Sequence, residues 1–227
     1  MALLRSSKIS EPVPIVRGKG VMMRAPCMMD YPAWAELRAM SRDHLAPWEP
    51  LWSREELTRS AFRRRVRHYQ REAREDLGYA YLVFAAPQPA PASAHGIFDI
   101  DGRPLAHPRP VQIPPALVGG VTLTNVRRGV TQAATLGYWL GAPYVRRGLM
   151  HDALSALIPF AFDVLRLHRI EAAVMPANAT SLRVLDRLGF SREGLARRYL
   201  KIAGRWEDHL LFGLVAEDVG RSEGGPQ

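Results

Sequence analysis

The sequence is almost free of cysteine: Cys27 is the only one among 227 residues. A disulfide framework needs pairs of cysteines, and the common structural zinc sites need several. The sequence also lacks the pattern His-Glu-x-x-His of zinc proteases and the phosphate-loop pattern Gly-x-x-x-x-Gly-Lys-Ser/Thr. We therefore expect no disulfides and no metal.

Long apolar runs and a recognisable leader are missing too. No run approaches the roughly 20 apolar residues that cross a bilayer, and the most apolar stretch, Ala153 to Phe162, contains Pro159. The first twelve residues carry charge and have no apolar centre of signal-peptide length. These absences predict a soluble, cytoplasmic protein without a membrane partner.

The composition is that of a folded chain, with 47% hydrophobic and 23% charged residues. We expect a single domain over residues 19–217, preceded by an extended arm (1–18), interrupted by a proline-rich insertion (87–115) and followed by a disordered tail (218–227). The net charge of +9 favours acidic partners, namely coenzyme phosphates, nucleic acid or a ribonucleoprotein surface.

Strand and helix patterns alternate along the chain. Strands are expected at 21–24, 79–85, 117–125, 136–140, 170–175, 197–202 and 206–215. Helices are expected from Asp30–Pro32 to Met40, over 54–75, from Met150 to Leu165, and over 179–188. Alternating strands and helices that end in a hairpin predict a mixed α/β sheet with helices on both faces.

The stretch from Leu136 to Arg166 carries the first functional signal. An aromatic strand leads through Arg146-Arg147-Gly148 into a helix with an apolar stripe that begins at Met150. The first N–H groups of a helix have no partner within it, so this arrangement can bind an anion such as a pyrophosphate. The alternative is an ordinary strand-to-helix turn.

Two motifs resemble the GCN5-related N-acetyltransferase (GNAT) family. The loop 146–149 resembles the family's Gln/Arg-x-x-Gly-x-Gly/Ala loop, from which Val145 and Met150 depart. Asn178-Ala179-Thr180-Ser181, followed by Leu188-Gly189-Phe190 and Glu193-Gly194, resembles its second signature. Further short matches over about residues 20 to 216 resemble the RimJ-like branch, the ribosomal-protein-alanine N-acetyltransferases.

The resemblance implies the GNAT fold, a mixed and mostly antiparallel sheet in which two parallel strands, ending here at Leu140 and Met175, splay apart. Acetyl-coenzyme A (acetyl-CoA) would lie in that opening, and the acceptor amine would enter from the other side. The implied coenzyme-binding residues are Tyr138, Trp139, Leu140, Arg146, Arg147, Gly148, Leu149, Met150, Asn178 and Ser181.

The catalytic candidates also follow from the resemblance. Ser181 would donate a hydrogen bond to the departing thiolate, and Asn178 would cap the helix that carries it. Glu49 would bind or deprotonate the acceptor ammonium; the alternative is a carboxylate paired with a nearby arginine. Ala173 stands where some relatives place a catalytic glutamate, so the general base stays open. The residues expected to bind the acceptor are Trp48, Glu49, Asn125 and Asp208.

The function predicted from these motifs is acetyl-CoA-dependent transfer to a protein N-terminal α-amine, with a ribosomal protein as acceptor. An α-amine has a reference pKa of roughly 7.7–8.0, against about 10.4 for lysine, so it needs a weaker base. The alternatives are acetylation of a small amine, such as a polyamine or antibiotic, and a non-catalytic ribosome- or RNA-binding module. The arginine-rich helix 54–75 is either a contact for RNA phosphates or a solvated face.

Overall fold

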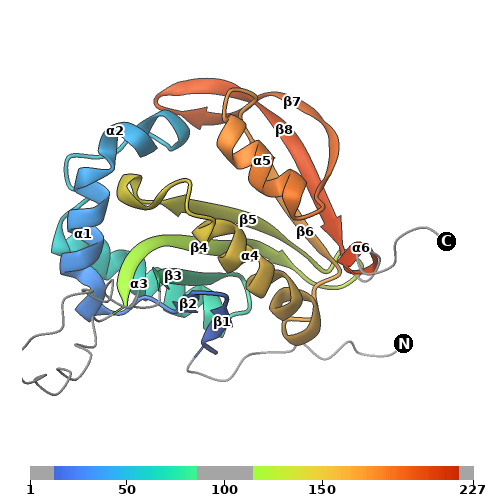
Figure 1. Ribbon diagram of the computed structural model, residues 1–227, viewed down its shortest axis with the longest axis horizontal. Helices are drawn as coiled ribbons and strands as arrows, with labels where there is room; N and C mark the ends of the chain where they lie inside the picture. Colours follow the sequence, from blue (N-terminus) through green and yellow to red (C-terminus); the bar gives the residue numbers. More distant parts are fainter. Residues whose placement is uncertain (1–12, 86–114, 220–227) are drawn as a thin grey trace, which may run out of the picture.

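The computed structural model describes residues 13–85 and 115–219, and within these ranges the chain forms one eight-stranded sheet (Figure 1). The strand order is β1-β2-β3-β4-β5-β6-β8-β7. The strands are β1 (Val16–Gly18), β2 (Val21–Arg24), β3 (Tyr79–Ala85), β4 (Ala116–Arg127), β5 (Ala133–Leu140), β6 (Arg169–Val174), β7 (Ser191–Ile202) and β8 (Arg205–Val215). Among them only β5 and β6 pair in parallel.

Helices cover both faces of this sheet. They are η1 (Met28–Asp30), α1 (Tyr31–Met40), α2 (Arg42–Leu45), η2 (Ala46–Trp48), α3 (Arg59–Arg74), η3 (Ala142–Tyr144), α4 (Leu149–Pro159), the π-helical turn η4 (Phe160–Val164), α5 (Ala179–Arg187) and α6 (Ala216–Val219). Strand β3 is buried on both sides: Leu82 and Phe84 pack with α1 and α3, while Tyr81 and Val83 pack in the core that contains α4. The mixed α/β fold expected from the sequence is confirmed.

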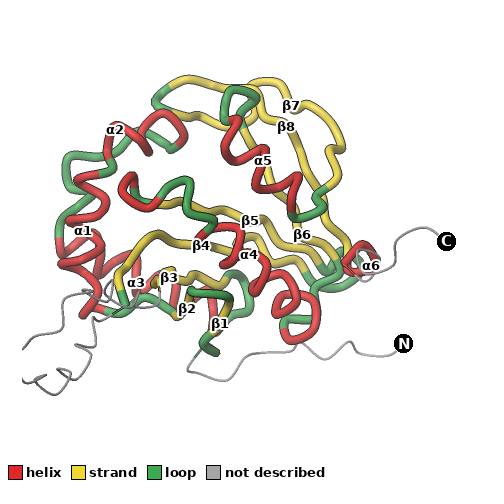
Figure 2. The backbone as a smooth tube through the Cα atoms, in the orientation of Figure 1, coloured by secondary structure: helices red, strands yellow, loops and turns green. Residues whose placement is uncertain are grey.

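The two parallel strands pair over a short distance only. The ladder joins Ala133–Thr135 of β5 to Arg169–Glu171 of β6, yet β5 continues to Leu140 and β6 to Val174. On its other edge β5 stays paired with β4 up to Leu140. The sheet therefore splits beyond Thr135, and the two halves diverge as Figure 2 shows. The splayed pair was also expected.

Two helices differ from their expected limits for local reasons. Helix α3 begins at Arg59, five residues after the expected start, because the Thr58 hydroxyl caps it by accepting a hydrogen bond from the Ala61 N–H (3.2 Å). Helix α4 ends at Pro159, where a π-helical turn follows and the Leu165 N–H bonds to the Phe160 carbonyl (3.1 Å). The expected continuous helix to Leu165 is corrected accordingly.

The structure describes only parts of the arm, the insertion and the tail that were expected around the domain. Residues 16–18, assigned to an extended arm, form β1 and pair with β2. Residues 1–12, most of the proline-rich insertion (87–114) and residues 220–227 lie outside the described part of the chain. Within the described part, no helix is long and apolar enough to cross a membrane, and no group of three or more His, Cys, Asp or Glu side chains is placed to hold a metal ion.

Candidate active site

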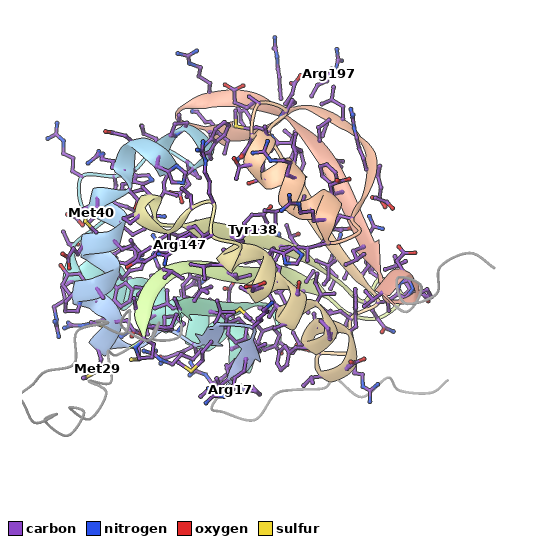
Figure 3. All side chains as sticks on the ribbon, viewed as in Figure 1. Arg17, Met29, Met40, Tyr138, Arg147 and Arg197 are labelled. Carbon is purple, nitrogen blue, oxygen red and sulfur yellow. The ribbon has the colours of Figure 1, made fainter. Side chains whose placement is uncertain are left out.

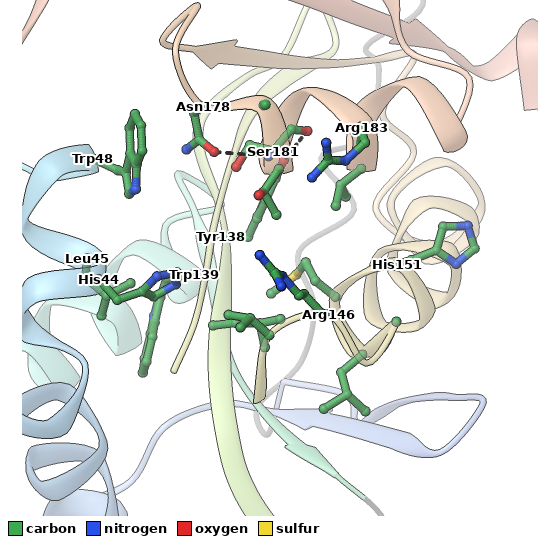
Figure 4. A pocket seen from close by; sticks show the side chains of 18 of the residues that line it. His44, Leu45, Trp48, Tyr138, Trp139, Arg146, His151, Asn178, Ser181 and Arg183 are labelled. Atoms are coloured by element: carbon green, nitrogen blue, oxygen red, sulfur yellow. Dashed lines mark hydrogen bonds between the residues drawn. The ribbon is translucent and has the colours of Figure 1, made fainter. Parts of the chain in front are cut away.

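A cavity of about 730 Å³ lies where β5 and β6 separate (Figure 4). Four segments line it. They are the α2–η2 segment (His44, Leu45, Trp48 and Glu49), the end of β5 (Tyr138–Leu140), the loop and first turn of α4 (Val145, Arg146 and Gly148–His151), and the start of α5 with the residues before it (Ala177–Ser181, Arg183, Val184 and Arg187). The splayed strands thus open into the cavity predicted from the resemblance.

The start of α4 forms one end of the cavity. Gly148 precedes this helix with φ = 77°, a left-handed conformation that glycine adopts without steric cost. No side chain of the described residues caps the helix, so its first N–H groups have no side-chain acceptor, and Leu149 and Met150 line the cavity. Arg146, also at positive φ (61°), lines it beside them. This end is built to bind an anion.

Arg147 does not join this end of the cavity. Its guanidinium lies over the Tyr144 ring, 5.8 Å from the centroid, and it is not among the residues lining the cavity. Of the two arginines, Arg146 lines the cavity, and coenzyme binding by Arg147 stays a prediction.

Three further basic residues at the same end were not expected from the sequence. Arg183 and Arg187 of α5 and His151 of α4 line the cavity with Arg146. The i, i+4 spacing of the two arginines puts them on one face of α5, but the sequence does not show that this face turns toward α4. Three arginines around an uncapped helix end suit a ligand with several phosphate groups, as coenzyme A has.

Ser181 lies at the start of α5, on the cavity wall. The Asn178 side chain caps this helix by accepting a hydrogen bond from the Ser181 N–H (3.1 Å). Tyr138 projects from β5 toward α5 (Figure 3), and its hydroxyl donates to the Ser181 carbonyl (3.2 Å). Burial raises the pKa of Tyr138 to about 12, so the phenol stays protonated at neutral pH. It fixes the position of Ser181 across the opening.

Glu49 lines the opposite wall, and its carboxylate is fully engaged. Arg38 donates two hydrogen bonds to it (2.7 and 2.6 Å), and the Trp52 indole N–H donates a third (2.7 Å). Arg38 is buried and lies over the rings of Trp52 (4.3 Å) and Trp139 (4.9 Å). Of the two roles considered for Glu49, the structure shows the carboxylate paired with an arginine. This pairing favours a structural role for Glu49 in the cavity wall over a role as proton acceptor.

Two expected acceptor residues lie away from the cavity. Asn125 is exposed in the irregular part of β4, with φ = 51°, at the end of the sheet where β5 and β6 are still paired. The Asp208 carboxylate accepts a hydrogen bond from the Arg198 N–H (2.7 Å) within the β7–β8 hairpin. The cavity thus brings Trp48 and Glu49 together without Asn125 or Asp208. Asn125 and Asp208 had been assigned to acceptor binding from short sequence motifs alone, which do not show where a residue lies in the fold.

The β7–β8 hairpin nevertheless touches this wall. The Ala203 N–H, at the hairpin turn, donates to the Glu49 carbonyl (2.9 Å). Figure 1 shows the hairpin reaching over to α2. This wall of the cavity is therefore joined to a segment about 150 residues further along the chain.

The arginine-rich helix α3 contributes nothing to the cavity. It packs through Phe62 and Val66 against the sheet face that α1 also covers, away from α4. Arg64 and Arg65 pair with Glu55 and Glu56. The exposed arginines are Arg59, Arg63, Arg64, Arg67, Arg71 and Arg74. Contact with RNA or a ribosome through this face stays a prediction.

Comparison with known proteins gives the same family from independent evidence. The family model for the acetyltransferase (GNAT) domain matches residues 21–191. A probable N-acetyltransferase of Bacillus subtilis, YjcK, is 31% identical over 204 residues, covering 90% of this chain and 98% of that protein. The Escherichia coli alanine N-acetyltransferase of ribosomal protein uS5 is 31% identical over 208 residues, covering 91% and 94%.

Solved structures of similar proteins have the same fold, and one of them contains a form of coenzyme A. The structure of Mycobacterium smegmatis RimJ in complex with CoA-disulfide superposes with a TM-score of 0.72 at 29% identity, covering 91% of this chain and 88% of that one. The Vibrio fischeri ribosomal-protein-S5-alanine acetyltransferase gives a TM-score of 0.72 at 28% identity, covering 91% and 98%. With the family model spanning most of the sequence and a split sheet that opens on a basic, uncapped helix end, the chain belongs to the GCN5-related N-acetyltransferase family and is an acetyl-CoA-dependent N-acetyltransferase.

Proposed function

We propose that this enzyme acetylates the N-terminal α-amine of a protein, and that the protein is a ribosomal one. The observation that carries this is the charge of the cavity: among the described residues that line it, Glu49 is the only acid, and Arg38 neutralises its charge. A polyamine or an aminoglycoside carries several positive charges and needs several carboxylates. The relative that modifies ribosomal protein uS5 supports the ribosomal acceptor.

We assign a role to each part of the cavity. The N–H groups at the start of α4, with Arg146, Arg183 and Arg187, hold the phosphates of the coenzyme. The edge of β5 beyond Thr135, which has lost its pairing with β6, offers main-chain groups to the pantetheine arm. Trp48 lines the opposite wall, where the acceptor enters.

The reaction in this arrangement is a direct attack. The neutral amine nitrogen forms a bond to the thioester carbon and loses one proton, the carbon–sulfur bond breaks, and sulfur leaves as the thiolate with the electron pair of that bond. The Ser181 hydroxyl donates a hydrogen bond to that sulfur and so stabilises the charge that develops there. An α-amine is in part unprotonated at neutral pH, which suits a cavity whose described lining residues offer no free carboxylate.

A panel of acceptors tests the proposed function. We expect labelled acetyl-CoA to modify peptides at a free N-terminus, and peptides with a blocked N-terminus and an internal lysine to stay unmodified. Spermidine and an aminoglycoside should react at least about 100-fold more slowly, because the cavity offers their charges no free carboxylate. Mass spectrometry of the products measures this. Efficient acetylation of a small amine, with peptides untouched, would contradict the proposal.

Replacing Ser181 with alanine tests the leaving-group role. We expect kcat to fall about 30-fold and the Kd of coenzyme A to change less than about threefold, because the hydroxyl acts on charge present only in the transition state. Steady-state kinetics and calorimetry give the two values. Ser181→Thr keeps the hydroxyl and should recover part of kcat. Equal losses of kcat and affinity in Ser181→Ala would show that the residue only supports the helix.

A further inference from the structure

The cavity contains few groups that can accept a proton near neutral pH. Arginine side chains stay charged at any relevant pH. Tyr138 holds its proton, since its pKa is raised to about 12 by burial. The Glu49 carboxylate accepts hydrogen bonds from Arg38 and Trp52. His151 lies at the phosphate end on α4, with its Nδ1 atom 3.6 Å from the Asp152 carboxylate. Among the described residues with an ionisable side chain that line the cavity, the one that remains is His44.

His44 stands on a short helix that is fixed on both sides. The hydroxyl of Ser41, a fully buried residue just before α2, accepts a hydrogen bond from the Ala142 N–H (2.9 Å). Leu45, the residue after His44, is buried. His44 itself is exposed to the cavity, and its ring forms no hydrogen bond or ion pair with any residue in the described part of the chain.

His44 is on the acceptor side. Figure 4 shows it with Trp48 and Trp139 on one side of the cavity, and Ser181 and Arg183 on the other. The proton released by an attacking amine must leave on the side from which the amine arrives, while the thiolate departs toward Ser181. A histidine with both nitrogens free, on that side, meets the geometric condition for a general base.

We propose that His44 is the catalytic base of acetyl transfer. As the nitrogen–carbon bond forms and the carbon–sulfur bond breaks, the proton leaves the amine nitrogen for the unprotonated nitrogen of the imidazole, directly or through one water. The thiolate keeps the electron pair of the broken bond, and the imidazolium then returns its proton to solvent. This inference rests on the proposed function in one respect, namely that the acceptor enters the cavity on the side of Trp48. It does not require the acceptor to be a peptide, because any primary amine must lose a proton in the same way.

Charged groups on three elements lie near this histidine. They are Arg42 and Asp43 on its own helix, Glu49 with Arg38 behind it, and Arg146 across the cavity.

His44→Gln tests the assignment, with His68→Gln on the far helix α3 as the matched control. We expect kcat/KM at neutral pH to fall about 100-fold in His44→Gln, while the Kd of coenzyme A stays within twofold. The control should match the wild type in both. Each variant is assayed with the best acceptor found in the panel above, whether peptide or small amine, so a failure of the proposed acceptor class does not affect this comparison.

The pH profile separates a base from a structural residue. In the wild type both the amine and the imidazole must lose a proton, so log(kcat/KM) should fall with a limiting slope of two on the acid side. In His44→Gln the slope should be one, because only the amine titrates. Added imidazole should restore part of the rate of His44→Ala. An unchanged rate and profile in His44→Gln, or a rate loss with slope two and no rescue, would overturn the proposal.

Discussion

Gly148→Asp is expected to weaken the binding of coenzyme A by about 100-fold, equivalent to about 2.7 kcal/mol. A Cβ atom at this position would meet no heavy atom within 4 Å, so the aspartate carboxylate would enter open space at the anion-binding end of the cavity. There it would repel the phosphates and compete for the N–H groups at the start of α4. Isothermal titration calorimetry with coenzyme A measures the change.

Gly148→Asn is the matched control for that variant. Asparagine has nearly the shape of aspartate, carries no charge, and tolerates a left-handed backbone such as the φ of 77° found here. Any cost of backbone strain is therefore shared by both variants, and we expect Gly148→Asn to lose only a few-fold in affinity. Equal affinities for the two variants would show that no phosphate lies near this glycine.

Arg38→Met is expected to lower the free energy of unfolding by about 3 kcal/mol. The Arg38 side chain is 6% exposed and that of its partner Glu49 is 22% exposed, so removing the guanidinium leaves a mostly buried carboxylate without its main partner. The contacts of the guanidinium with the rings of Trp52 and Trp139 are lost as well. Urea denaturation followed by fluorescence or circular dichroism measures the loss.

The double variant Arg38→Met with Glu49→Gln separates the charge from the packing. Glutamine removes the buried negative charge and keeps an acceptor for the Trp52 indole N–H, so we expect it to recover about half of the lost stability. A loss below about 1 kcal/mol in Arg38→Met would mean that water reaches Glu49 freely. The wall of the acceptor side would then be looser than the hydrogen bonds indicate.

The sequence was sufficient for the fold and for the two segments around Gly148 and Ser181 that line the cavity, because each depends on a local pattern. The strand–loop–helix around Gly148 is a continuous segment, and the Asn178 cap of Ser181 spans three residues. Each can be read from residue types and spacing alone. Helix α4 shows where such local patterns fail. The apolar stripe continues to Leu165 and predicts one helix, but the regular helix ends at Pro159.

The acceptor side was harder to predict because it is assembled from distant segments. Glu49 meets Arg38 only because α1, α2 and η2 fold back on themselves, and Trp139 reaches Arg38 from about 100 residues away. No local motif contains such contacts. For the same reason Asn125 looked suitable in sequence but lies at the paired end of the sheet. At the phosphate end, Arg183 and Arg187 were not expected either, because the sequence does not show which side of α5 faces the cavity.

The hydrogen bond from Ala203 to the Glu49 carbonyl has a consequence for how such enzymes diverge. The segments it joins, the hairpin turn and the chain before α3, share no residue with the starts of α4 and α5, which line the cavity. Insertions or exchanges in either segment can therefore reshape the entrance for a new recipient molecule while the machinery for the donor is inherited unchanged.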